Sequence, residues 1–346
     1  MRVKALFKNR LFLIGFSIIG TFLFISLFYW AFFGDDIPRL DYFLEDENGK
    51  LLRPPYSGSI YPPLGTDEFG RNIFIVMIVG FKYTLLAALI ITFLRVVPSV
   101  FFGLAIHYIF GRFERPIKSL ADSINYFPTT LLAYLLLFYM SFAGIYMEDP
   151  AVPGFWGRVA VFIVILSLIF IPANSVLIAN EVKKIDNMEF IEVSRTLGAD
   201  TARIILQHIR PFLVPQLYII FIREFIQTLL LMSHLGVLGI FIGGSIVREN
   251  LFYREVLTSR SDEWTGLIGL WWQYLWTTYP WISVIPIVAF TVLILSAKCM
   301  LEGTKEVYSA ETATVQVAEK QQVIIDPAIP PFQLLSTAKK RQITKS

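Results

Sequence analysis

The uncharged run at residues 11–33, LFLIGFSIIGTFLFISLFYWAFF, constrains the fold of this chain more than any other feature. A helix rises 1.5 Å per residue, so about 20 apolar residues cross the roughly 30 Å hydrocarbon core of a bilayer. Basic residues precede the run, as they do in a signal peptide. The run is long for a signal peptide, however, and no small-residue cleavage site follows it. We therefore expect a first transmembrane helix over 11–33 that anchors the chain.

Five further apolar runs follow, near residues 83–106, 120–143, 159–179, 213–246 and 281–301. Only 16% of the residues are charged, against about 25% in soluble domains. We predict an all-α polytopic membrane protein with about six transmembrane helices. The run at 213–246 is too long for one straight crossing, so it is either one tilted helix or a helix followed by a broken piece at GVLGIFIGG. Kinks are expected at Pro98, Pro128 and Pro172.

The positive charges give an orientation. Lys and Arg recur in residues 1–10, in the 107–119 and 180–211 loops, and after the last run, whereas residues 34–72 hold eight acidic and four basic residues. Cytoplasmic loops carry the excess of Lys and Arg. We therefore place both termini and the 180–211 loop in the cytoplasm, and the 34–80 segment outside. The membrane core covers 81–308, and the polar composition of 309–346 predicts an irregular cytoplasmic tail.

The 180–211 loop is polar and helix-forming within an apolar chain. Asp186 can cap a first short helix, with Glu189 completing a capping box. Gly198 suits the left-handed position that ends this helix, and Asp200 can cap a second one. Pro211 is expected to stop the second helix from extending unchanged.

Each of these two helices has an apolar face. Phe190, Val193 and Leu197 share a face of the first helix, and Ile205 and Ile209 share a face of the second. Helices this short are marginal in water, so their apolar faces need a packing partner. Either they dock on the chain's own membrane domain, or they present a ridge to a soluble partner.

A second motif, LGTDEFGRN at residues 64–72, precedes the second apolar run. Gly65 and Gly70 permit tight turns. Asp67 can accept hydrogen bonds from nearby backbone amides, and Arg71 can pair with it. We interpret Gly65, Thr66, Asp67, Gly70 and Arg71 as a structural elbow at the outer membrane surface.

The cytoplasmic motif resembles the "EAA" signature of bacterial ABC importer permeases. EVSRTLGA stands where that family has EAARALGA, and RIILQHIRP is similar to RIIFRHILP of the peptide-transporting branch. The elbow resembles the LGTDxxGRD segment of the dipeptide, oligopeptide and nickel permeases. The Trp-rich segment 263–281 is similar to an external amphipathic segment of the same branch, and its Trp264, Trp271, Trp272, Trp276 and Trp281 predict an interfacial aromatic belt.

The resemblance implies a type I ABC importer permease in which a cytoplasmic coupling helix docks on an ATPase. It assigns that coupling to residues of the 186–211 loop, namely Glu192, Val193, Ser194, Gly198, Ala199, His208 and Pro211. The implied partners are a homologous second permease, two ABC ATPase domains and an extracytoplasmic substrate-binding protein. The implied cargo is a di- or oligopeptide, with no nucleic acid, and the implied location is the bacterial cell membrane.

No catalytic role is expected for this chain. It lacks a Walker GxxxxGK[ST] motif, so ATP and Mg²⁺ would be used by the partner ATPase. No two histidines have the i,i+4 spacing of a helical metal site, and we expect neither a metal nor a cofactor here. Two alternatives stay open: the same importer class carrying nickel chelates or another small solute, and, more distantly, an integral membrane lipid-modifying enzyme.

Two charged residues within apolar runs, Arg95 and Glu224, are candidates for the substrate pathway, with Glu224 as a contact for a peptide amine. Arg95 interrupts the second run, and a charge at bilayer depth suggests a functional site. It can face a substrate carboxylate, form an ion pair within the bundle, or lie nearer an interface. Arg223 and Glu224 point about 100° apart on a helix, so we expect them to meet neighbouring helices or a partner subunit rather than each other.

Overall fold

The computed structural model describes residues 3–40, 44–45, 51–111, 114–142, 153–249 and 255–322. Most of them are helical, which confirms the all-α class. The α-helices are α1 (Val3–Leu6), α2 (Arg10–Phe33), α3 (Ile73–Tyr108), α4 (Glu114–Tyr126), α5 (Thr129–Phe142), α6 (Phe155–Leu168), α7 (Ile171–Asp186), α8 (Glu189–Thr196), α9 (Thr201–Arg203), α10 (Arg210–Val237), α11 (Trp264–Trp271) and α12 (Trp281–Gln322). A π-helix (Ile204–Ile209) joins α9 to α10, and a 3₁₀ helix (Trp272–Trp276) follows α11.

Four helical stretches in the described part of the chain are long and apolar enough to span a membrane: α2, α3, Thr201–Val237 and the Trp281–Ala310 part of α12. The pair α6 and α7, bent by 41°, forms a fifth if it is one span. These four or five candidates are fewer than the expected six. The run at 120–143 is not one continuous helix, because the chain breaks at Pro128 between α4 and the short α5.

Two of the three prolines, Pro128 and Pro172, lie at breaks between helices, and the third does not. Pro172 lies in the first turn of α7, directly after the bend from α6. Pro98 lies inside α3, which is continuous. The long run at 213–246 takes the second of its two expected forms, since α10 ends at Val237 and a turn with Gly239, Gly243 and Gly244 at positive φ follows.

Two antiparallel hairpins interrupt the helical pattern, and neither is anticipated by the apolar periodicity. The first joins β1 (Leu44–Glu45) to β2 (Leu51–Leu52), and the second joins β3 (Ser245–Glu249) to β4 (Glu255–Ser259). In the second hairpin Ser245 is paired with Ser259 and Glu249 with Glu255.

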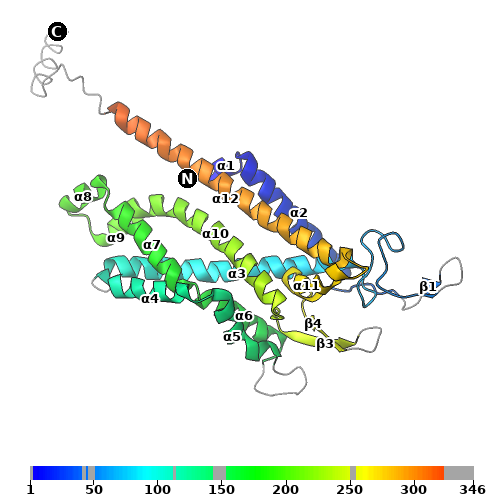
Figure 1. Cartoon of the computed structure of the whole chain (residues 1–346). Helices are drawn as coiled ribbons and strands as arrows, with labels where there is room; N and C mark the ends of the chain where they lie inside the picture. Colours follow the sequence, from blue (N-terminus) through cyan, green and yellow to red (C-terminus); the bar gives the residue numbers. More distant parts are fainter. Residues whose placement is uncertain are drawn as a thin grey trace, which may run out of the picture.

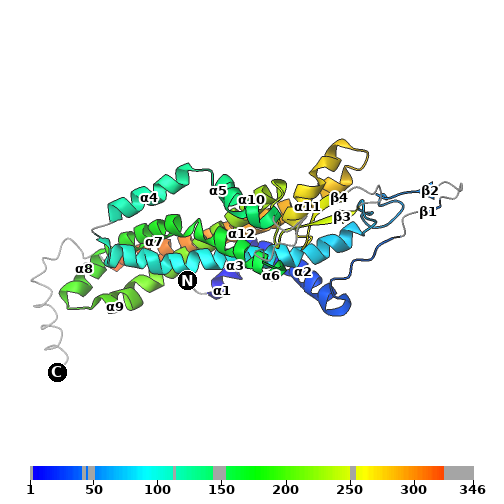
Figure 2. The ribbon, with the colours of Figure 1, turned by 90° about the horizontal axis from the view of Figure 1, so that it is seen from below.

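The long helices run along the molecule between two opposite ends (Figure 1). One end carries α8 and α9, and we call it the loop end. The opposite end carries the strands and α11, and we call it the elbow end; Figure 2 shows the same separation from below. Helix α12 packs along α2, and α3 packs along α7. Asn9, just before α2, donates from Nδ2 to Glu306 Oε2 of α12 at 2.8 Å.

The Trp-rich segment is partly internal, which corrects the expected aromatic belt. Trp264 and Trp271 are fully buried, while Trp272 and Trp276 are exposed. The Trp264 indole donates to Met77 O at 2.7 Å and packs on the ring of Phe81. These tryptophans therefore hold α11 against the helical core.

Helix α12 extends past the expected start of the tail at residue 309 and continues to Gln322. Residues 323–346, with the motifs DPAIPPF and AKKRQITKS, lie outside the described residues.

Two glycines of α2 offer a matched test of the packing between α2 and α12. A Cβ atom added at Gly15 would lie 2.1 Å from Ser296 O of α12, whereas one added at Gly20 would meet nothing within 4 Å. We expect Gly15→Ala to cost about 1–3 kcal/mol of stability by forcing the helices apart. Gly20→Ala should be neutral or slightly stabilising, because alanine favours a helix. Equal thermal unfolding of the two variants in detergent would contradict this packing.

Candidate functional site

Asp186, the last residue of α7, organises the loop end. Its carboxylate accepts two hydrogen bonds from Arg195 Nη2 of α8, at 2.7 and 2.6 Å. It also contacts two side chains at the end of α3, His107 Nε2 at 3.0 Å and the hydroxyl of Tyr108 at 3.0 Å. The hydrogen bonds that Arg195 donates to Asp186 raise the pKa of Arg195 above its ordinary value. One carboxylate thus fastens α8 to the ends of α3 and α7.

This role of Asp186 corrects the predicted capping box. The N-cap of α8 is Met188, and no side chain caps that helix end. The Asp186 oxygens are engaged by Arg195, His107 and Tyr108 instead. The prediction considered only residues adjacent in sequence, and two of these partners come from α3.

The other two caps of the loop are confirmed. Gly198 takes φ +85° directly after α8, and its N–H donates to Arg195 O at 2.9 Å. Asp200 Oδ1 accepts a hydrogen bond from Thr201 N at 2.8 Å at the start of α9. The glycine is needed because side chains disfavour this left-handed backbone conformation.

Pro211 does not end the second loop helix, but the helix does not pass it unchanged, which agrees with the prediction. Helix α9 passes through the π-helix Ile204–Ile209 into α10, where Pro211 lies in the first turn. Proline has no N–H and its ring clashes with the carbonyl four residues earlier. A π-helical turn has a wider bonding pattern, so it carries the chain past the proline while remaining helical. The second loop helix and α10 are therefore one continuous helical segment.

Helix α8 is apolar on two faces, and only one of them is covered. Ile191 is fully buried against a cluster that includes Ile204 and Ile209. On the other face, Phe190, Val193 and Leu197 are exposed to 40%, 56% and 82%. The two alternatives for the loop are therefore not exclusive. One face of α8 docks on the chain's own core, and the other face presents an apolar ridge.

The remaining predicted coupling residues surround this ridge. Glu192 is exposed, and Ser194 is half-buried with its hydroxyl donating to Phe190 O at 2.8 Å. Ala199, also half-buried, donates its N–H to Ser194 O at 3.0 Å. The His208 ring lies 6.3 Å from the Phe190 ring, centroid to centroid. The structure brings all of them to the loop end, and their coupling role stays a prediction.

The elbow has the local contacts that its sequence predicts. Asp67 Oδ1 accepts from the backbone N–H of Phe69 and of Arg71, both at 2.9 Å, and Asp67 Oδ2 accepts from Arg71 Nε at 2.7 Å. Gly65 and Gly70 have φ of +80° and +72°. The Thr66 hydroxyl accepts from Tyr56 N at 2.9 Å.

A partner of Arg71 that the sequence does not reveal is Asp262. Arg71 Nη1 donates to both Asp262 carboxylate oxygens at 2.9 Å, across 191 positions of the chain. Both side chains are buried. Burial alone would lower the pKa of the Arg71 guanidinium, but Asp67 and Asp262 raise it above its ordinary value. The arginine therefore stays charged and joins the elbow to the segment before α11.

Glu263, next in sequence, is a second buried carboxyl at this end. Its Oε1 accepts from Ile242 N at 3.0 Å, and its Oε2 contacts the hydroxyls of Ser259 and Ser261. Burial raises its pKa to about 7, although these hydrogen bonds oppose the rise. The side chain ties the turn after α10 to the end of β4.

The two candidate substrate-pathway residues, Arg95 and Glu224, are buried together between helices. Arg95 Nη1 lies 3.9 Å from Glu224 Oε2, and the exposed fractions of the two side chains are 0% and 1%. This corresponds to the alternative of an ion pair within the bundle. Arg223 Nη2 also pairs with Glu224 Oε1 at 3.3 Å, so the expectation that these neighbours do not meet is wrong. The long arginine side chain reaches back across the 100° between them.

Arg95 has a structural task at the break between α6 and α7. At the break, Phe170 N–H bonds to Ser167 O at 3.4 Å, which leaves Leu166 O without its helical partner. Arg95 Nε donates to Leu166 O at 2.9 Å, and its guanidinium lies 4.0 Å from the Phe170 ring centroid. An unsatisfied carbonyl in hydrocarbon is costly, so Arg95 stabilises the break. A substrate role for it stays a prediction.

Removing the Asp186 carboxylate should loosen α8. In Asp186→Ala, Arg195, His107 and Tyr108 lose their common acceptor, and hydrogen bonds to charged groups are worth roughly 1.5–3 kcal/mol. We expect backbone amides of α8 to exchange about tenfold faster in hydrogen–deuterium exchange. The control is Glu181→Ala, which removes a carboxylate of the same helix whose partner is the exposed Lys184. Unchanged exchange in Asp186→Ala would contradict this role.

Glu263 should give the elbow end a pH-dependent stability. Its pKa is about 7 when folded, against 4.5 for an unperturbed glutamate. The folded state therefore binds the proton more tightly, so the stabilising contribution is full below about 4.5 and is lost as the pH rises through about 7. We expect the unfolding temperature to fall over that interval, and to fall less in Glu263→Gln. An identical pH profile for the two proteins would contradict this assignment.

Comparison with known proteins gives related transport subunits. No family model matches the chain. The glutathione transport system permease protein GsiD of Escherichia coli is 27% identical over 176 residues, which are 51% of this chain and 53% of that protein. GsiD of Pectobacterium atrosepticum is 25% identical over 218 residues (63% and 65%), and the dipeptide transport system permease protein DppC of Alkalihalophilus pseudofirmus is 25% identical over 243 residues (68% and 70%).

The matched region spans about half the length of the GsiD protein from Escherichia coli. All three relatives are named as permease proteins, which supports the expectation of a transport subunit rather than an enzyme. Together with the apolar helices, they also support a multi-pass membrane protein. The chain is thus similar to the permease subunits of peptide ABC transporters.

Proposed function

We propose that this chain is the membrane-spanning permease subunit of an ATP-driven ABC importer and that it contributes half of the translocation pathway. The observation that carries the proposal is the exposed apolar ridge of α8, formed by Phe190, Val193 and Leu197. It lies at the tip of the loop end, on the segment whose sequence resembles the coupling signature. Exposed apolar surface of this kind marks an interaction site.

The loop is built to pass a displacement into the membrane helices. Asp186 fastens α8 to α3 and α7, and the π-helix makes α9 continuous with α10. In the proposed mechanism, ATP-driven closure of two ATPase domains moves α8, and α3, α7 and α10 follow. The pathway then opens outward, a binding protein delivers the substrate, and hydrolysis resets the assembly. The chain itself binds neither ATP nor Mg²⁺ in this scheme.

The proposal sets the orientation and the remaining partners. The loop end and both termini face the cytoplasm of a bacterial cell, in line with the excess of Lys and Arg in these segments. The elbow end faces outward, where a substrate-binding protein docks. A homologous second permease completes the pathway within the membrane.

Small peptides are the proposed cargo. The relatives are named for the transport of glutathione and of dipeptides, and the elbow motif resembles that of peptide permeases. Uptake of a labelled dipeptide and of a nickel chelate by cells with and without this gene separates the two cargo classes. Dipeptide uptake should be lost in cells without the gene. If these cells lose only the uptake of the nickel chelate, the cargo is a nickel chelate and not a peptide.

Replacing the ridge should release the ATPase. We expect gentle detergent extraction to yield this chain with an ATPase and a second permease, identified by mass spectrometry. The double variant Val193→Asp, Leu197→Asp should lose most of the ATPase, roughly tenfold or more, because charges on the ridge prevent apolar contact. It should retain the second permease.

The control is Ile60→Asp, which places the same charge on an exposed apolar residue of the elbow end. It should keep the ATPase. A wild-type chain that carries no ATPase, or a ridge variant that carries as much as the wild type, would refute the proposed function.

A further inference from the structure

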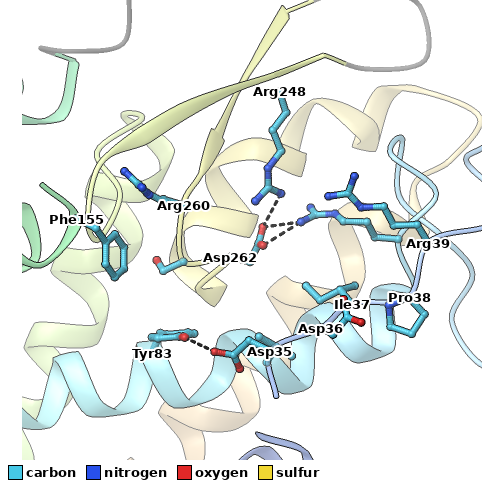
Figure 3. A pocket seen from close by; sticks show the side chains of 13 residues that line it. Asp35, Asp36, Ile37, Pro38, Arg39, Tyr83, Phe155, Arg248, Arg260 and Asp262 are labelled. Atoms are coloured by element: carbon cyan, nitrogen blue, oxygen red, sulfur yellow. Dashed lines mark hydrogen bonds and ion pairs between the residues drawn. The ribbon is translucent and has the colours of Figure 1, made fainter. Parts of the chain in front are cut away.

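A polar cavity of about 700 Å³ opens at the elbow end (Figure 3). It is lined by the segment between α2 and α3, the outer part of α3, the start of α6 and the β3–β4 hairpin. Its volume lies within the roughly 300–1,000 Å³ of small-molecule sites. Four arginines and three aspartates contribute to the lining: Arg39, Arg71, Arg248, Arg260, Asp35, Asp36 and Asp262.

The floor of the cavity is charge-balanced. Arg71 is held between Asp67 and Asp262, and Arg248 Nη1 lies 3.5 Å from Asp262 Oδ1. Two carboxylates therefore compensate two guanidinium groups. These groups hold one another and form a fixed base for the rest of the site.

The other two arginines of the lining have no such compensation. Arg39 and Arg260 are both exposed, and among the described residues no carboxylate forms an ion pair with either. Arg260 lies over the Phe155 ring, 5.5 Å from its centroid. Figure 3 shows Arg248 and Arg39 on one side of the cavity near Asp262, and Arg260 on the side of Phe155.

The guanidinium of Arg248 is repelled by the neighbouring guanidinium groups of Arg71 and Arg39. Burial lowers the pKa of its guanidinium, Asp262 opposes this, and the neighbouring Arg71 and Arg39 lower it further. A bound anion would relieve this repulsion.

The side of the cavity near α3 has the opposite character. The Asp35 carboxylate is occupied, since it pairs with Lys82 and accepts from the Tyr83 hydroxyl at 2.5 Å. Asp36 is exposed, and within the described part of the chain its carboxylate has no hydrogen-bond or ion-pair partner. The lining of the cavity thus offers two guanidinium groups without a carboxylate partner, Arg39 and Arg260, and one free carboxylate, Asp36.

We propose that this cavity binds the C-terminal carboxylate of a small peptide through Arg260 and Arg39, with Asp36 facing the peptide's amino group. A guanidinium presents paired N–H donors that match a carboxylate in geometry and charge. The choice of a peptide as ligand rests on the proposed function; the preference for a carboxylate rests on the arginines alone.

The test measures binding to the full-length chain in lipid nanodiscs, with Ala-Ala, its C-terminal amide and its N-acetyl derivative as probes. Calorimetric titration should show binding of Ala-Ala, and the amide should bind at least tenfold more weakly. Acetylation should weaken binding by a smaller factor, because a single exposed carboxylate faces the amine. Equal affinity for Ala-Ala and its amide would overturn the proposal.

Variants locate the site. Arg260→Gln and Arg39→Gln should each raise the Kd for Ala-Ala about tenfold with an unchanged unfolding temperature. The control Arg203→Gln removes the same charge from an exposed position at the loop end and should bind as the wild type does. Wild-type affinity in both cavity variants would refute the assignment.

A docking point for an acidic side chain of a binding protein would use the same arginines, and binding of Ala-Ala separates the two. If the wild type binds no Ala-Ala, and Arg260→Gln instead reduces cross-linking to the binding protein, the peptide site is refuted. Because ATPase co-purification depends on the loop end, a failure of peptide binding with the ATPase retained would overturn only this inference and leave the proposed function standing.

Discussion

The buried guanidinium of Arg71 determines how the elbow end is assembled. It lies between Asp67, four residues earlier, and Asp262, which belongs to the segment before α11. Removing one member of such a buried cluster leaves a charge without compensation, which typically costs about 3–5 kcal/mol. The start of α3, the hairpin and α11 are therefore held in one arrangement. The cavity proposed to take a peptide carboxylate uses this cluster as its floor.

A buried arginine also joins separate segments among the membrane-spanning helices. Hydrocarbon offers no hydrogen bonds, so a broken helix must find partners within the protein. The break between α6 and α7 frees Leu166 O, and Arg95 satisfies it while Glu224 offsets the charge of the arginine. A charged residue that looks anomalous in an apolar run is thus explained by a carbonyl on another helix.

Sequence reasoning succeeded where the determining contacts are local. The turn at Gly198, the cap at Asp200 and the pairing of Asp67 with Arg71 each involve residues within four positions, and all are confirmed. The first apolar run likewise gave α2 almost to the residue.

It failed where a partner is distant or where composition is ambiguous. Nothing near Arg71 indicates Asp262. Asp186 does not cap the next helix; it pairs with Arg195 of that helix and with His107 and Tyr108 of the distant α3. The apolar run to residue 246 left two forms open from the sequence, and the break at GVLGIFIGG is the one observed. The strand that follows it from Ser245 was not anticipated.

The π-helix at Ile204–Ile209 has a mechanical consequence. A flexible linker would allow the loop to rotate without rotating α10. A hydrogen-bonded helical segment instead transmits both rotation and translation to α10. Inserting one residue rotates everything beyond it by about 100°, so the number of residues between Asp200 and Pro211 sets the angular phase of the α8 ridge relative to α10. The length of this segment, rather than its composition alone, is what the loop end must preserve.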